Sequence, residues 1–144
     1  MRIPPAGLFL VAAGAQAALG RLSTPRLLRA APLLAASGVL GVAAVGGFLR
    51  AGTTIDPVRV NRASSLVTDG VLGYTRNPMY LALAGALTAH AVARGSWAGL
   101  LPVAGFVWAV DRGQIAAEEA ALRARFGPEY EAYAARVPRW VRPR

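Results

Sequence analysis

The sequence predicts an all-α, polytopic membrane protein with about four transmembrane helices and a helical C-terminal extension in the cytoplasm. Of its 144 residues, 55% are hydrophobic and only 16% are charged, whereas about a quarter of the residues of a soluble domain are charged. The charges are confined to a few segments, and these separate four long uncharged stretches. A chain of this length is expected to form a single membrane-embedded domain, residues 1–144.

The four uncharged stretches are the expected transmembrane helices. They cover residues 3–20, 30–49, 77–93 and 95–110. A helix needs about 20 apolar residues to cross a bilayer, within a range of roughly 17–25. The second stretch has that length, and the first approaches it. The last two are short, so the charged residues that bound them, Arg76, Arg94 and Asp111, are expected at the membrane surfaces. Residues 1–50 would therefore supply two N-terminal transmembrane helices.

The first stretch has an alternative interpretation as a cleaved signal peptide. Arg2 precedes the apolar run, and Ala15-Gln16-Ala17 is similar to a cleavage site. However, only one charge precedes the run, two prolines follow that charge, and a longer apolar stretch comes next. A retained helix is therefore the favoured prediction, with the signal peptide kept as the alternative.

Only Arg94-Gly95-Ser96 separates the third and fourth stretches, which predicts a tight antiparallel hairpin. Small residues in both stretches would let the two helices approach closely. These residues are Ala82, Ala84, Gly85, Ala86, Ala89, Gly99, Ala104 and Gly105.

The distribution of arginine predicts the orientation. Every one of the 16 basic residues is an arginine, and the formal net charge is +9. With four transmembrane helices, Arg21, Arg26, Arg29 and Arg94 lie on one side of the membrane and the other twelve lie on the opposite side. The arginine-rich side, which carries both termini, is expected in the cytoplasm. Because the arginines flank apolar segments, a bilayer is the expected partner and nucleic acid is not.

The residue types that are missing exclude several kinds of chemistry. The chain has no cysteine and a single histidine, His90. Thiol catalysis, disulfides and cysteine-ligated metals are therefore excluded, and no metal site is expected. His90 lies inside the third stretch and is expected to pack against neighbouring helices rather than to react.

The first candidate site is the start of the third stretch, Arg76-Asn77-Pro78-Met79-Tyr80, which follows the polar segment 51–76. Asparagine is favoured as a helix N-cap and proline at the first helical position. The free N–H groups at a helix start, with Arg76 beside them, could hold a carboxylate or a phosphate. Equally, Asn77 and Pro78 could simply begin a helix that Arg76 and Tyr80 anchor at the membrane surface.

The second candidate site follows the fourth stretch. Helical propensity continues through residues 111–126, interrupted only by Gly113, until Gly127-Pro128 ends the helix. Helical spacing places Asp111, Gln114, Glu118, Leu122 and Arg125 on one face. The face could be an ordinary solvated stripe. Alternatively, Glu118 and Glu119 could bind a cation such as the α-ammonium group of a cofactor, or ribose hydroxyls.

A short last helix is expected over residues 129–136, with Tyr130 and Tyr133 on one side and Arg139-Trp140 after it. Aromatic residues and arginines near a membrane surface are usually anchors. They could also close a lid over a pocket.

Together these segments resemble the isoprenylcysteine carboxyl methyltransferase family, especially its small bacterial members, and the related phospholipid methyltransferases. The resemblance covers residues 51–141. It rests on Leu66-Val67-Thr68-Asp69-Gly70, on Tyr74-Thr75-Arg76-Asn77-Pro78-Met79-Tyr80, on Glu118-Glu119, and on Phe126-Gly127-Pro128-Glu129-Tyr130 with Tyr133.

The resemblance implies that residues 51–144 form a methyltransferase-like catalytic region with a cytoplasm-facing S-adenosylmethionine pocket. The family's Arg-His-Pro-x-Tyr motif corresponds to Arg76, Asn77, Pro78 and Tyr80, so asparagine stands in place of the usual histidine. Arg76 and Tyr80 are the expected catalytic residues. The expected cofactor-binding residues are Asn77, Pro78, Tyr80, Glu118, Glu119 and Leu122.

The resemblance also implies location and reaction class. We expect an integral protein of the bacterial inner membrane that methylates a lipophilic or lipid-like acceptor, on a carboxylate oxygen or an amine nitrogen. Arg76 would orient an anionic acceptor. Two alternatives remain open at this point: an NADPH-dependent membrane reductase of related fold, and a small membrane protein without enzymatic activity.

Overall fold

Every regular element that the structure describes is a helix. The computed structural model describes residues 4–52 and 65–141. The elements are α1 (Pro5–Leu19), α2 (Thr24–Arg50), the 3₁₀ turn η2 (Gly70–Gly73), α3 (Pro78–Arg94), the 3₁₀ turn η3 (Trp97–Gly99), α4 (Leu100–Ala109), the π-helical turn η4 (Val110–Ile115), α5 (Ala116–Phe126) and α6 (Pro128–Arg136). The prediction of an all-α protein is confirmed. Thr53, Asp56 and the other polar residues of segment 53–64 lie outside the described residues.

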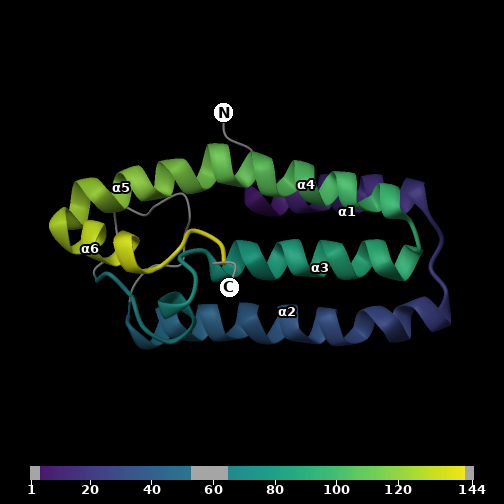
Figure 1. Ribbon diagram of the computed structural model, residues 1–144, viewed down its shortest axis with the longest axis horizontal. Helices are drawn as coiled ribbons and strands as arrows, with labels where there is room; N and C mark the ends of the chain where they lie inside the picture. Colours follow the sequence, from purple (N-terminus) through teal and green to yellow (C-terminus); the bar gives the residue numbers. More distant parts are fainter. Residues whose placement is uncertain (1–3, 53–64, 142–144) are drawn as a thin grey trace.

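The helix α3 is the centre of the bundle. It lies between α2 and α4, and α1 packs against both α3 and α4 (Figure 1). Five of its alanines are buried, and such small side chains let neighbouring helices approach it closely: Ala82, Ala84, Ala89, Ala91 and Ala93. Leu87 at its middle is fully buried. It belongs to a core that includes Ala12 of α1, Tyr80 of α3 and Phe106 of α4.

The segments α4, η4 and α5 form one continuous helix, as the sequence predicts. The interruption expected at Gly113 is a π-helical turn within this helix rather than a break. Such turns shift the side chains that follow by part of a turn and recur near functional sites. The helix ends at Gly127, whose φ of 49° lies in the region that favours glycine, and α6 begins at Pro128.

Within the described residues, one helix is long and apolar enough to cross a membrane by length and composition. This is α2, which begins at Thr24, earlier than the uncharged stretch that starts at residue 30. The helix α1 is apolar but has only 15 residues, and α3 has 17. Four transmembrane helices therefore remain a prediction.

Small residues do allow close helix packing, but mainly between α3 and α2 rather than between α3 and α4. A Cβ atom at Gly85 would collide with Ser37 Oγ of α2, and one at Gly41 would lie 3.6 Å from Ala82 Cβ. The prediction was wrong for Ala104 and Gly105, which are exposed on α4. The packing partner of a small residue depends on helix rotation, and spacing along one helix does not specify it.

Buried polar side chains fasten α1 to the rest of the bundle. Gln16 Nε2 donates hydrogen bonds to the carbonyl oxygens of Leu87, at 2.9 Å, and Gly99, at 2.8 Å. Gln16 Oε1 lies 2.8 Å from His90 Nδ1, and Arg94 Nε donates to His90 Nε2 at 2.9 Å. This network supports the packing role expected for His90. It also fastens α1 to α3 and to the turn before α4.

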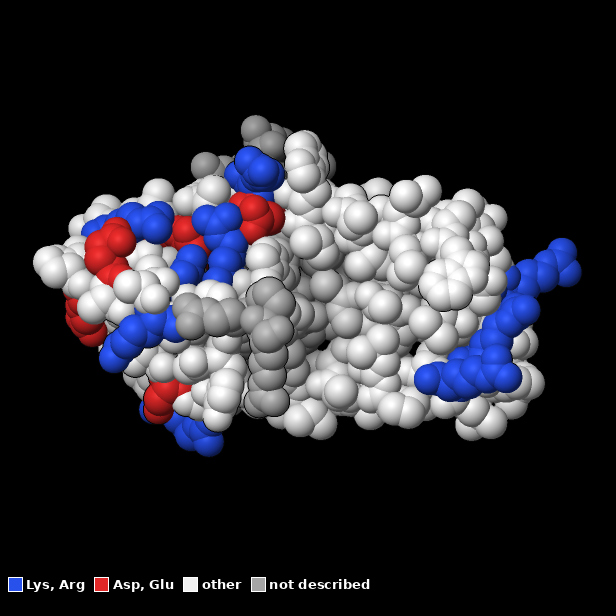
Figure 2. Space-filling view, in the orientation of Figure 1, with Lys and Arg blue, Asp and Glu red and all other residues white. Residues whose placement is uncertain are grey.

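The charged residues gather at the two ends of the bundle, and the band between them is uncharged on the face that Figure 2 shows. One end carries the turn from α1 to α2 and the turn from α3 to α4, with Arg21, Arg26, Arg29 and Arg94. The opposite end carries the start of α3, α5 and α6 (Figure 1).

The close approach of α2 and α3 predicts that valine in place of Gly85 destabilises the protein more than valine in place of Gly105. Gly85→Val should lower the unfolding free energy by about 1–3 kcal/mol, because the added side chain has no room beside Ser37. Gly105→Val is the matched control, since nothing lies within 4 Å of a Cβ atom there. Thermal unfolding of both variants in detergent measures this. An equal response would mean that α2 and α3 do not pack through Gly85.

Candidate functional site

The start of α3 lies against the C-terminal segment. Asn77 occupies the N-cap position and Pro78 begins the helix, as the sequence predicts. However, the Asn77 side chain makes no capping hydrogen bond. Its Nδ2 instead donates to the carbonyl oxygen of Arg139 at 2.8 Å, and the Thr75 hydroxyl donates to the same oxygen at 3.2 Å. Asn77 therefore holds the C-terminal segment in place.

Arg76 connects three segments of the chain. Its Nη1 donates to the carbonyl oxygens of Ala134, at 2.9 Å, and Val137, at 2.7 Å, and its Nη2 pairs with Glu119 Oε1 at 2.7 Å. Its backbone N–H also donates to the carbonyl oxygen of Pro138. The side chain is 12% exposed. Its contacts hold α5 and the end of α6 against the start of α3.

Glu119 is the acidic partner of three arginines. Besides the contact with Arg76, its Oε2 lies 2.7 Å from Arg139 Nη2, and its Oε1 accepts from Arg139 Nε at 3.0 Å. Arg123 Nη1 lies 3.6 Å from Oε2. Burial alone would raise the pKa of this carboxyl, but the hydrogen bonds and charges of Arg139 and Arg76 lower the pKa overall. Glu119 is therefore an ionised carboxylate with both oxygens occupied.

Arg139 extends the network to the π-helical turn. Its Nη1 reaches both carboxylate oxygens of Asp111, at 3.2 and 3.1 Å, and the Trp140 indole N–H donates to Asp111 Oδ1 at 2.9 Å. The carboxylates of Glu119 and Asp111 together raise the pKa of Arg139. Asp111, Arg139 and Trp140 were not among the predicted site residues. Asp111 shares the predicted face with Glu118, and that spacing is the only signal that could have found it.

Glu118 lies in a different environment from its neighbour. The Tyr80 hydroxyl donates to Glu118 Oε1 at 2.6 Å, and Gln114 Nε2 donates to the same atom at 2.9 Å. Glu118 Oε2 has no hydrogen-bond partner among the described residues. Burial raises the pKa of this carboxyl, an effect that the hydrogen bonds from Tyr80 and Gln114 oppose and the charge of Glu119 reinforces. The pKa is thus raised for Glu118 and lowered for Glu119, and Glu118 alone keeps a carboxylate oxygen that can accept a further hydrogen bond.

Tyr130, Tyr133 and Leu122 form a small apolar core beneath α6. Tyr130 and Tyr133 are buried with Val137, and Leu122 packs against them. The Tyr133 hydroxyl donates to the carbonyl oxygen of Leu72 in η2 at 2.7 Å. The tyrosines are therefore packing residues rather than exposed anchors, and Leu122 contacts this core.

The structure brings the predicted site residues together from two distant segments. At the start of α3, Arg76 pairs with Glu119 of α5 and Tyr80 bonds Glu118 of α5. Asn77, next to Pro78, instead bonds the carbonyl oxygen of Arg139. Only Leu122 contacts a separate group, the core beneath α6. For a cofactor with a cationic or hydroxyl-bearing group, Glu118 has a suitable acceptor in its Oε2, whereas Glu119 has both oxygens committed to arginines.

The contrast between the two glutamates predicts opposite responses to amide substitution. Glu119→Gln should lower the unfolding free energy at pH 7 by about 3 kcal/mol, because it removes the carboxylate that pairs with Arg76 and leaves Arg139 with Asp111 alone among the described residues. The figure is at the low end for a broken buried pair because Arg139 is 34% exposed. Glu118→Gln should change the stability little, because an amide oxygen can still accept from Tyr80.

The pH dependence follows from the lowered pKa of Glu119. Its stabilising effect is complete above the ordinary glutamate pKa of 4.5 and is lost as the pH falls through the lower pKa of the folded state. The difference in stability between wild type and Glu119→Gln should therefore shrink from pH 7 to about pH 3. Thermal melts across this range measure it. A difference that stays constant with pH would contradict the ion-pair assignment.

Comparison with protein families identifies one relationship. A family model described as phospholipid methyltransferase matches residues 26–129. The matched region runs from the start of α2 into α6, so it includes Arg76, Tyr80, Glu118 and Glu119 but not Arg139 or Trp140. No curated protein and no solved structure matches the chain.

Proposed function

Because the chain belongs to the phospholipid methyltransferase family, we propose that it is an integral membrane methyltransferase that uses S-adenosylmethionine and acts on a lipophilic or lipid-like acceptor. The family assignment agrees with the resemblance predicted from the sequence, since isoprenylcysteine carboxyl methyltransferases are related to this family. The observation that carries the proposal is the hydrogen-bonded group of Tyr80, Glu118 and Gln114. It joins two of the sequence segments on which the resemblance depends.

Membrane insertion is supported by the surface of the bundle. The most apolar window of α2 is only 11% buried, so α2 is unlike the core helix of a soluble protein. Large apolar side chains are also exposed on other helices, for example Val11 at 71%, Leu101 at 73% and Trp108 at 67%. Apolar surface on several sides of a bundle is suited to lipid and not to water.

We propose that α1, α2, α3 and α4 all cross the membrane. The shorter helices α1 and α3 would be accommodated by a locally thinner bilayer and by charged residues that reach its surface. The uncharged band in Figure 2 has the position that the bilayer core requires. The end of the bundle with α5 and α6 would face the cytoplasm of a bacterial cell, because four membrane crossings would assign twelve of the 16 arginines of the sequence to that side.

The cofactor would bind beside Glu118. S-adenosylmethionine supplies a methyl group that is already electrophilic because it is bonded to a sulfonium. Glu118 Oε2 would accept from the α-ammonium group or a ribose hydroxyl, and Tyr80 would orient the Glu118 carboxylate through Oε1. Asn77, Pro78 and Leu122 would shape the pocket. Glu119 would act indirectly, by holding Arg76 and Arg139 so that Glu118 keeps its position.

The chain's part in methyl transfer is to bind, orient and exclude water. The C-terminal segment lies over the start of α3 through Asn77, Arg76 and Arg139, and it would separate the site from bulk water. An ionised carboxylate acceptor could attack the methyl group directly, whereas an amine acceptor would first lose a proton. Arg76 would contribute positive charge toward an anionic acceptor, although its terminal nitrogens already bind Glu119 and two carbonyl groups.

Cofactor binding provides the first test. Glu118→Ala should weaken S-adenosylmethionine binding about 10- to 100-fold, the loss expected when one charge-assisted hydrogen bond is removed. The matched control is Glu131→Ala, which removes an exposed carboxylate that pairs only with Arg123 among the described residues. Isothermal titration in detergent measures both. Unchanged affinity in Glu118→Ala would remove this carboxylate from the site.

The reaction class has its own test. Membranes that contain the protein, incubated with methyl-labelled cofactor, should accumulate label in the lipid fraction, and Tyr80→Phe should lower the rate because it removes the hydrogen bond to Glu118. Titration with NADPH runs in parallel. Affinity for NADPH without affinity for S-adenosylmethionine would favour a reductase, and affinity for neither would favour a protein without enzymatic activity.

A further inference from the structure

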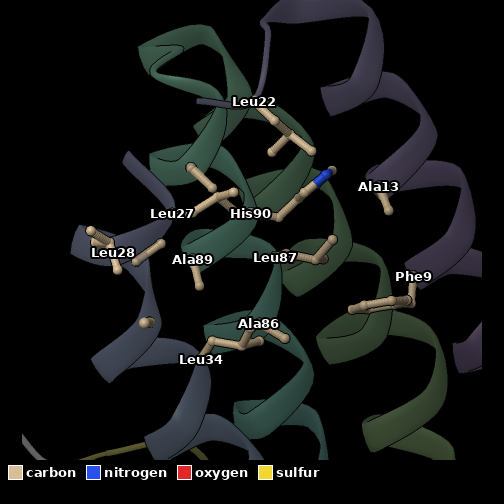
Figure 3. Close-up of a pocket in the computed structure, with 13 residues that line it drawn as sticks. Phe9, Ala13, Leu22, Leu27, Leu28, Leu34, Ala86, Leu87, Ala89 and His90 are labelled. Atoms are coloured by element: carbon tan, nitrogen blue, oxygen red, sulfur yellow. The ribbon is translucent and has the colours of Figure 1, made fainter. Parts of the chain in front are cut away.

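A recess lies toward the end of the bundle opposite the proposed active site. It has a volume of about 630 Å³, within the range of roughly 300–1,000 Å³ that ligand pockets occupy. Phe9 of α1, Leu34 of α2 and Leu87 of α3 contribute to its walls (Figure 3). His90 also lines it, about 15 Å along α3 from Tyr80 at helical rise. The recess is therefore separate from the Tyr80–Glu118 group.

The recess exists because α1 and α2 each pack against α3 but scarcely contact each other. The space between them is a groove with α3 as its floor. Its lining is apolar apart from His90, and Gln16 and Arg94 already engage both ring nitrogens of that histidine. In a bilayer, such a groove is filled by hydrocarbon, because water finds few partners there and an empty groove loses dispersion contacts.

Several arginines adjoin, in the chain, residues that line the groove, for example Arg26 beside Leu27 and Arg94 beside Ala93. Arg26 extends from the start of α2 to the end of α3, where its guanidinium lies against Gly95. Arg94 extends from α3 to α1, with Nη1 donating to the carbonyl oxygens of Ala17 and Gly20. Arg21 and Arg29 lie close by in the chain. Among the described residues, no carboxylate forms an ion pair with any of these four arginines.

Arg26 in particular has capacity for an anionic ligand. Its side chain is exposed, and its two hydrogen bonds, to the carbonyl oxygens of Arg21 and Arg94, are long at 3.4 and 3.5 Å. A phosphate here would give the Arg26 guanidinium a negatively charged partner in place of two distant carbonyl oxygens. A lipid phosphate would lie at this depth when one acyl chain occupies the groove below.

We propose that this groove binds one anionic phospholipid of the membrane leaflet opposite the active site, with an acyl chain between α1 and α2 and the headgroup phosphate at Arg26. The lipid fills the gap between the two N-terminal helices and neutralises the arginine cluster. The inference rests on the membrane placement proposed above and is independent of the methyl-transfer reaction.

Lipid titration tests this by native mass spectrometry of the purified full chain in a non-ionic detergent. Phosphatidylglycerol should bind about fivefold more tightly than phosphatidylcholine with the same acyl chains, the effect of roughly 1 kcal/mol per arginine near anionic lipid. Arg26→Gln should remove this preference. Arg50→Gln, at the other end of the same helix, is the control and should retain it.

The acyl-chain site is tested by filling the groove. Ala31 is an exposed residue of α2 that lines the recess, so Ala31→Phe should lower the affinity for both lipids. Ala36→Phe, at an exposed position of α2 that does not line it, should leave both affinities unchanged. Thermal melts check that each variant is folded; if Ala31→Phe unfolds, the Arg26→Gln comparison still decides.

Two results would overturn the proposal. One is equal affinity for the two lipids in wild type, or a preference that survives Arg26→Gln. The other is a protein dimer that Ala31→Phe dissociates, which would make the groove an interface between two copies of the chain. Because neither measurement uses S-adenosylmethionine, failure here leaves the methyltransferase proposal standing, and failure of cofactor binding leaves this proposal standing.

Discussion

The contact of Glu119 with Arg76 and Arg139 is the constraint on which the active-site end of the bundle depends. One carboxylate joins α5, the residue before Asn77, and the C-terminal segment. Neighbouring residues of an α-helix point about 100° apart. With Glu119 directed at the arginines, Glu118 is directed at Tyr80 of α3, and one of its oxygens keeps its capacity to accept a hydrogen bond. The ion pairs of Glu119 therefore fix the orientation of α5 in which Glu118 can bind a ligand.

The opposite end of the bundle uses polar contacts of another kind. Gln16, His90 and Arg94 form neutral or singly charged hydrogen bonds, mostly to backbone carbonyls, and no acidic residue takes part. These contacts hold α1 on α3, while Gly85 and Ser37 let α2 approach α3 from another side. Because α1 and α2 are fastened separately to α3, a groove remains between them, and the arginines at this end form no ion pair within the described part of the chain.

Local sequence signals predicted the elements well where backbone chemistry alone determines them. Pro78 begins α3, Gly127-Pro128 separates α5 from α6, and the helix after residue 110 continues past Gly113. The predictions of which groups each side chain contacts were less accurate. The Asn77 side chain holds the C-terminal segment instead of capping α3, Leu122 packs on the tyrosine core, and Gly85 faces α2. Each of these depends on the rotation and docking of a distant helix.

The sequence by itself determined the helical class, the uncharged segments, the arginine-rich ends and the two short motifs that resemble the methyltransferase family, because each depends on residue type and spacing along one segment. Only the tertiary structure decided which of two adjacent glutamates is committed to arginine. That choice depends on Arg139, which is distant in the chain from Arg76 and meets it only when α6 folds back against the start of α3. Ion pairs form between groups that are close in space, and the spacing of residues along the sequence does not specify that distance.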